Sequence, residues 1–137
     1  MSVTLTVQDK NTLRTAAYGA VSLLAAADAA GSPHRVATNG SIALASATGP
    51  VGYVLAEKSK IEKLNGKSVA EIADHVLPAL TASIDLLKKQ DPAEADNFRS
   101  TVTVAIEAAT RAHKGEPSPA MAAMTRKITG ALDGEIA

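Results

Sequence analysis

Two stretches of this chain carry apolar side chains at the spacing of one face of an α-helix. The first stripe comprises Leu13, Ala17, Val21 and Leu24, and its next position is Asp28. The second comprises Phe98, Val102, Ile106 and Ala109, and its next position is His113. Steps of three and four residues are typical of amphipathic helices. Alanine, which has the highest helix propensity, is also the most frequent residue. The sequence therefore predicts an all-α fold.

Glycine, proline and capping residues divide the chain into helices. Ser32-Pro33 and Ser118-Pro119 are typical helix starts, and Ser68 to Glu71 has the pattern of a capping box. Pro78 predicts a kink or a break near Leu77. We expect a compact single-domain bundle of five or six helices over 1–137. The expected helices span about 8–30, 33–47, 50–64, 68–87, 92–113 and 119–132. Residues 1–7 are expected to form a flexible or extended arm or a short strand, and residues 133–137 a loose tail.

Residues 42–55 also allow a β-hairpin. In that arrangement Ile42 and Leu44 would face Val51, Tyr53 and Leu55 across the turn that contains the Gly-Pro step. Alanine and serine dilute the alternation of apolar and polar residues, so helices are the favoured prediction here.

Composition narrows the functions that the chain can have. It contains no cysteine, which excludes disulfides, cysteine-ligated metals and thiol catalysis and fits the cytoplasm. Its 14 basic and 14 acidic residues balance, and its aromatic residues are two tyrosines and one phenylalanine. Nucleic-acid binding is therefore not expected, since it needs basic patches and stacking platforms. We predict no cofactor.

The apolar stretch over residues 16–30 allows two interpretations. Lys10 and Arg14 precede it and Ala27-Asp28-Ala29 has the pattern of a cleavage site, so it is superficially similar to a signal peptide. Its alanine-rich composition favours a structural helix instead. A membrane span is not expected, because the run is shorter than about 18–20 residues and ends in an acid.

The two apolar helices have further features in common that predict an internal duplication. When Leu13 is aligned with Phe98, the spacings of both stripes agree, Arg14 matches Arg99, and each helix leads through glycine into a Ser-Pro helix start. Any two amphipathic helices share a stripe, so the alternative is coincidence. The duplicated unit would be a helix–turn–helix pair.

This pair, used twice, resembles the tellurite-resistance TerB-like helical domain over residues 13–47 and 98–132. In that family an alanine-rich helix ends in an Ala-Asp-Gly turn and is followed by a helix with an acid in its first turns. The resemblance implies an all-α bundle with acidic metal sites at the turns and a link to stress responses. Here Ala29 replaces the glycine and Arg35 replaces the acid, while the second copy has His113 and Ala122. Hard cations need several oxygen ligands, so we expect no metal site at these turns.

Asp28 and His113 are the first candidate binding residues. They could converge as ligands or as an acid–base pair if their helices run parallel. In an antiparallel pair, a stripe of about 15 residues would separate them by about 22 Å. The alternative is that Asp28 lies on an exposed rim and that His113 is favoured by a helix C-terminus.

Three more candidates lie in the loop that contains Gly49, Gly52 and Tyr53. Its glycines could let a ligand or a backbone segment approach closely. The simpler interpretation is a tight turn with Tyr53 packed over it.

Other chemical patterns in the sequence have simpler structural explanations. Glu71, Asp74 and His75 form half of a metal site, yet no second half accompanies them. Gly66-Lys67-Ser68 matches the end of a phosphate-binding loop motif, but the first glycine of that motif is missing.

Two hypotheses for function follow. The first is a non-catalytic helical module, stress-associated if the resemblance holds, that binds a protein partner or itself. Met121 and Met124 would give it an adaptable apolar surface, unless both pack in the core. The second is a small-ligand or metal-binding domain built on Asp28, His113, Gly49, Gly52 and Tyr53.

Overall fold

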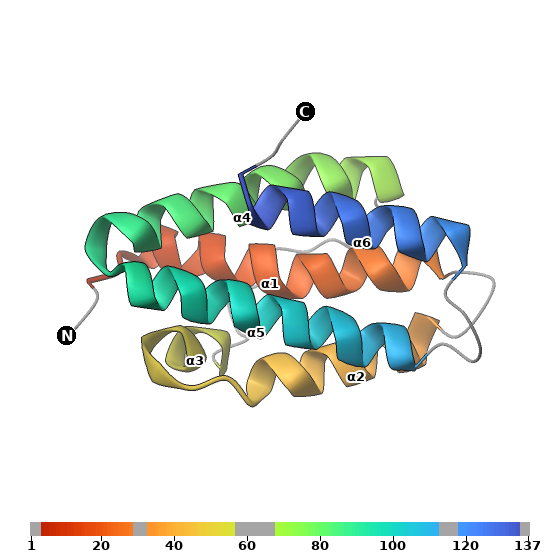
Figure 1. The fold of residues 1–137 in the computed structure, drawn as a ribbon, viewed down its shortest axis with the longest axis horizontal. Coiled ribbons are helices and arrows are strands. Elements are labelled where there is room, and N and C mark those ends of the chain that lie inside the picture. Colours follow the sequence, from red (N-terminus) through yellow and green to blue (C-terminus); the bar gives the residue numbers. More distant parts are fainter. Residues whose placement is uncertain (1–3, 29–32, 57–67, 113–117, 135–137) are drawn as a thin grey trace.

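The computed structural model describes residues 4–28, 33–56, 68–112 and 118–134, and these ranges contain six α-helices and no strand (Figure 1). The helices are α1 (Val7–Ala27), α2 (Pro33–Ala45), α3 (Gly49–Ala56), α4 (Val69–Gln90), α5 (Pro92–Arg111) and α6 (Pro119–Leu132). The predicted all-α bundle is confirmed. The hairpin alternative is wrong, because Ile42 lies in α2 and Tyr53 in α3. The predicted end of the third helix near residue 64 lies outside the described residues.

Helix α1 is the centre of the bundle and contacts each of the other five described helices. Every residue from Leu13 to Val21 is buried, so the helix has no exposed side over this stretch. A helix that is apolar nearly all round must be buried in this way. The described part of the segment that resembles a signal peptide, residues 16–28, therefore belongs to the core of the bundle.

The other five described helices pack around α1, and the six helices run in two opposite directions (Figure 1). Helices α1 and α5 run one way, whereas α2, α4 and α6 run the other way. Helix α4 packs on one side of α1 and α2 packs on another, while α5 contacts each of the other five described helices. As a result, the C-terminal ends of α1 and α5 lie at the same end of the molecule.

Side-chain caps fix where the described helices begin. Ser68 and Glu71 form the predicted capping box of α4, and Thr6 forms another with Asp9 at the start of α1. The oxygens of Asp91 and Ser118 accept the amides of Ala93 and Met121. Helix α1 begins at Val7, one residue earlier than expected.

Glycine inside α2 is explained by close packing. A Cβ atom at Gly40 would lie 2.7 Å from the side chain of Val21, so α2 approaches α1 too closely for a larger residue. Small side chains permit the short interaxial distances that helix pairs can adopt.

The packing decides between the alternatives that the sequence left open at Pro78 and at the two methionines. Of the kink or break predicted near Leu77, the break is absent, because α4 continues through Pro78. Val76 and Leu80, on either side of the proline, are fully buried, and this packing compensates for one missing backbone hydrogen bond. Met121 and Met124 are also buried, so they belong to the core and cannot supply an adaptable surface.

No helix in the described ranges is both long enough and apolar enough to cross a lipid bilayer.

Candidate functional site

Asp28 does not lie on an exposed rim, as one interpretation expected, but is 3% exposed. It is the C-cap of α1, and its backbone N–H donates to the carbonyls of Leu24 at 3.0 Å and Ala25 at 3.2 Å. Helix α1 thus ends at a buried aspartate, whose backbone N–H closes the last turn. Burial of this position follows from the central place of α1, which the local sequence does not reveal.

The second helix-end candidate, His113, lies outside the described residues. The preceding residue, Ala112, is buried at the C-terminal end of α5. Because α1 and α5 run in the same direction, Asp28 and Ala112 lie at one end of the bundle (Figure 1). Contact between Asp28 and His113 would require their helices to run parallel, and α1 and α5 do run parallel.

The candidate residues Gly49, Gly52 and Tyr53 belong to the short helix α3. Gly49 begins it with a φ of 73°, a conformation that favours glycine. A Cβ atom at Gly52 would overlap the carbonyl oxygen of Ala47, so the glycine admits a backbone segment of the chain itself. Tyr53 is 80% exposed, and the prediction that it packs over the turn is wrong. The reason is that residues 49–56 form a helix instead of a tight turn, and Tyr53 lies on the exposed side of this helix.

The N-terminal end of α3 is occupied by side chains from α5. The Glu94 carboxylate accepts the backbone N–H of Val51 at 3.3 Å. The Asn97 side-chain amide donates to the carbonyl of Thr48 at 3.0 Å. A carboxylate at a helix N-terminus is favoured by the helix dipole. Any anion that bound here would first have to displace Glu94.

The C-terminal end of α3 is held by two side chains from α1. The Arg14 Nε donates to the carbonyl of Val54 at 2.9 Å, and the Tyr18 hydroxyl donates to the carbonyl of Leu55 at 2.6 Å. Both side chains are buried, and a cation is favoured at a helix C-terminus. Burial raises the pKa of the Tyr18 phenol above its usual value. Arg14 and Tyr18 are one helical turn apart in α1. The sequence shows this spacing, but it does not show that α3 packs against both side chains.

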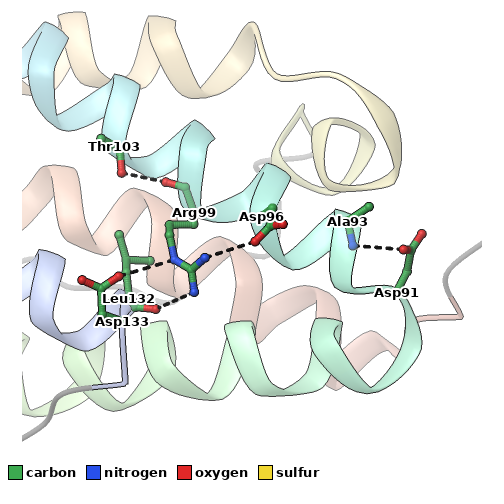
Figure 2. A network of polar contacts seen from close by, with 7 residues as sticks. All are labelled: Asp91, Ala93, Asp96, Arg99, Thr103, Leu132 and Asp133. Carbon is green, nitrogen blue, oxygen red and sulfur yellow. Dashed lines mark hydrogen bonds and ion pairs between the residues drawn. The ribbon is translucent and has the colours of Figure 1, made fainter.

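A similar arginine on α5 holds the end of α6 (Figure 2). The Arg99 guanidinium lies 3.1 Å from the Asp96 carboxylate and 3.5 Å from that of Asp133, and it donates to the carbonyl of Leu132 at 3.4 Å. This network joins α5 to the C-terminus of α6. Its partners are the polypeptide itself, which gives the network a structural role.

From Val36 onwards, helices α2 and α3 carry no charged side chain. The sequence from Val36 to Ala56 contains no Asp, Glu, Lys or Arg, although a fifth of the whole chain (20%) is charged. Within it Ile42 is 61% exposed. On the adjacent helix α5, residues 100–106 are also uncharged, and Val104 is 48% exposed. The run of uncharged residues was visible in the sequence, but its significance required knowledge that both helices lie at the surface.

Between α2 and α5 lies a hollow of about 200 Å³. It is lined by small and hydroxyl-bearing residues, together with one amide and one valine: Ala43, Ser46, Ala47, Thr48, Asn97, Ser100, Thr101 and Val104. We refer to the α2–α5 face as the surface formed by Ile42, Ala43, Ser46, Ala47, Ser100 and Val104. It combines an exposed apolar side chain on each helix with a concave strip of small residues between the helices.

A second, larger groove of about 630 Å³ lies between α1 and α4. Its polar lining comprises Gln8, Asn11, Thr12, Thr15 and His75, and its apolar lining comprises Pro78, Ala79 and Ala82. The volume falls in the range of small-molecule sites, which is about 300–1,000 Å³. Of the three residues considered as half of a metal site in the sequence, His75 lines this groove. Over the described ranges no three His, Asp or Glu side chains lie close enough together to hold a metal ion.

Comparison of the chain with protein-family models, with curated proteins and with solved structures finds no match. The resemblance to the TerB-like domain therefore remains a prediction.

Proposed function

We propose that this chain is a non-catalytic helical module that binds a protein partner through the α2–α5 face. The observation that carries the proposal is the exposed, uncharged surface around Ile42 and Val104, with a concave strip of small residues between them. The buried centres of protein interfaces are depleted of charged residues. The elements that present this face are rigid, because α2 packs on α1 and α5 and its neighbour α3 is held at both ends.

The other features of the chain support an interaction role. The strongest polar clusters, around Arg14 and Arg99, bind backbone carbonyls of the chain itself. A cytoplasmic location of the protein is consistent with the absence of cysteine. A stress-associated role, which the resemblance to the TerB-like domain implies, is part of this proposal.

Capture of partners from lysate of the native host tests the role of the face. We expect Ile42→Glu to reduce captured protein at least about tenfold, since burying an unpaired charge at an interface costs more than about 1.4 kcal/mol. Val69→Glu is the matched control: Val69 is another exposed valine, at the start of α4, where an acid is favoured. Equal capture by the wild type and both variants would contradict the proposal.

The polar groove between α1 and α4 favours a second candidate function, binding of a small polar molecule. Neutral hydrogen-bonding side chains dominate its lining, so a neutral ligand rich in hydroxyl or amide groups fits it best. In a thermal-shift panel of such metabolites, saturation at about 100 times Kd should add about 2.7 kcal/mol and raise Tm by several degrees. His75→Ala should abolish the shift, whereas His34→Ala, on α2, should retain it. A hit that is insensitive to His75→Ala, or a panel without hits, would argue against this function.

A further inference from the structure

We infer that the groove between α1 and α4 binds a neutral polyhydroxylated molecule, a sugar or a sugar alcohol, with the Thr15 hydroxyl and the backbone carbonyl of Asp74 as its anchors. This inference rests on the second candidate function, binding of a small polar molecule. It adds the chemical class of that molecule and the two groups that hold it.

The first argument is a buried hydroxyl group. Thr15 lines the groove and is only 8% exposed, yet its hydroxyl makes no hydrogen bond to any described residue. Two other helical threonines donate to the carbonyl four residues earlier: Thr12 to Gln8 at 3.0 Å and Thr110 to Ile106 at 2.8 Å. A buried polar group that is left unpaired costs free energy. A ligand hydroxyl in the groove would remove this cost.

The second argument is a backbone carbonyl on the opposite wall. In an α-helix each carbonyl points toward the N–H four residues further on. Pro78 carries no N–H, so the carbonyl of Asp74 lacks this donor and points toward Pro78, which lines the groove. Each of the two helices therefore offers the groove a polar group without its usual partner.

The third argument is the chemistry of the whole lining. The described residues that line the groove include no Asp, Glu, Lys, Arg, Phe, Tyr or Trp. The neighbouring charged residues of the two helices, Asp9, Lys10, Asp74 and Asp85, do not line it. A bound phosphate or carboxylate would lack a cation, and a flat heteroaromatic ring would lack an aromatic or arginine side chain to stack on. A hydroxyl both donates and accepts, so it can pair with the amides, threonines and carbonyl found here.

The two walls of the groove also differ in the way that a sugar requires. The polar side chains of residues 8–15 follow α1 over about 10 Å, while the side chains of residues 78–82 that face them are apolar. A sugar ring has hydroxyls along its edge and C–H groups on its faces, so its edge would meet α1 and one face would meet α4. A Cβ atom at Gly19, one turn beyond Thr15, would overlap Val76 of α4, so close helix contact fixes the spacing of the walls. Such a site needs little ordering when a ligand binds.

Titration of the ¹⁵N-labelled full chain with glucose, trehalose and sorbitol, followed by amide chemical shifts in NMR spectra, tests the inference. We expect at least one of the three to cause saturable shifts at millimolar concentration in residues 8–15 and 75–82. Inorganic phosphate and uracil, the charged and heteroaromatic alternatives, should cause none. Chemical shifts are the appropriate measurement, because sugars stabilise folded proteins generally and a rise in Tm alone does not show binding.

Two substitutions separate binding from folding. Thr15→Val removes a hydroxyl that has no partner in the protein and should not lower Tm. Pro78→Ala restores an N–H to the Asp74 carbonyl and should raise Tm by at least about 2 °C. Both should weaken sugar binding at least about fivefold, since the ligand loses a hydrogen bond. The matched control is Thr110→Val on α5, which removes a hydroxyl bonded within its own helix and should bind as the wild type does.

Two outcomes would overturn the inference: no saturable shifts with any of the three polyols, or equal binding by the wild type, Thr15→Val and Pro78→Ala. Binding of uracil or phosphate alone, abolished by His75→Ala, would also overturn it but would leave the second candidate function standing. If the wider metabolite panel gave no hit either, both would be removed.

Discussion

At the scale of single residues, the most informative positions are polar side chains that satisfy the backbone of a neighbouring helix. Tyr18 and Arg14 of α1 bind the last carbonyls of α3 in buried surroundings. A buried carbonyl without a donor costs about 1–3 kcal/mol, so these bonds matter more than their number suggests. Neither residue was a candidate from the sequence, because their target is about 40 residues away along the chain.

Substitution Tyr18→Phe tests this role. It leaves the carbonyl of Leu55 without its donor, and we expect the free energy of unfolding to fall by about 1–3 kcal/mol at pH 7. The measurement is urea denaturation followed by circular dichroism. Tyr53→Phe is the matched control, since Tyr53 is exposed and its loss of a hydroxyl should change stability by less than about 0.5 kcal/mol.

The pH dependence of the unfolding free energy, compared between the wild type and Tyr18→Phe, provides a second measurement. Burial raises the pKa of Tyr18 in the folded chain above the ordinary value of 10.0. The contribution of the neutral phenol is therefore complete below pH 10 and is lost as the pH rises through the folded pKa. Unfolding free energies of the wild type should decline in that alkaline range, and the Tyr18→Phe variant should lack this component. Parallel declines would contradict the assignment.

At the scale of secondary-structure elements, the short helix α3 depends on its neighbours. Helices as short as eight residues are marginal in isolation, and α3 is bounded by an acid from α5 at its N-terminus and a cation from α1 at its C-terminus. Both charges have the sign that the helix dipole favours. Its position is thus set by long-range contacts more than by its own sequence.

Substitution Glu94→Gln should loosen α3 without unfolding the bundle. The amide retains an acceptor for Val51 but loses the charge that the dipole favours, which is worth about 0.3–1 kcal/mol. Hydrogen exchange measured by NMR should become about two- to fivefold faster for the amides of α3. Glu107→Gln, at an exposed position of the same helix α5, is the control and should leave these amides unchanged. Equal rates in all three proteins would show that Glu94 does not hold α3.

At the scale of the whole molecule, the two halves of the predicted duplication have related but unequal surroundings. Arg14 bonds Asn11 three residues earlier and a carbonyl near the end of α3, while Arg99 bonds Asp96 three residues earlier and a carbonyl at the end of α6. The packing differs, because α1 is buried on every side from Leu13 to Val21, whereas α5 keeps an exposed side that includes Val104. The duplication remains a prediction that these matching arginines support.

Much of the fold was predictable because its signals are local. The N-caps Ser68, Asp91 and Ser118 act within one turn, so their sequence patterns set the starts of α4, α5 and α6 as predicted. The continuity of α4 through Pro78 was not predictable, since it depends on burial of Val76 and Leu80. The candidate site was predicted least well: Tyr53 was expected to pack and is exposed, and Asp28 was expected at the rim and is buried.

The sequence by itself determined the helical class, the helix starts and the absence of charge over residues 36–56, because helix propensity, capping and composition are properties of neighbouring residues. Tertiary structure alone decided that α1 lies at the centre, that α1 and α5 run parallel, and that α2 and α5 present their uncharged residues around a common hollow. Those features arise from contacts between residues far apart in the chain. Such contacts depend on how whole helices fill space, and no local pattern encodes them.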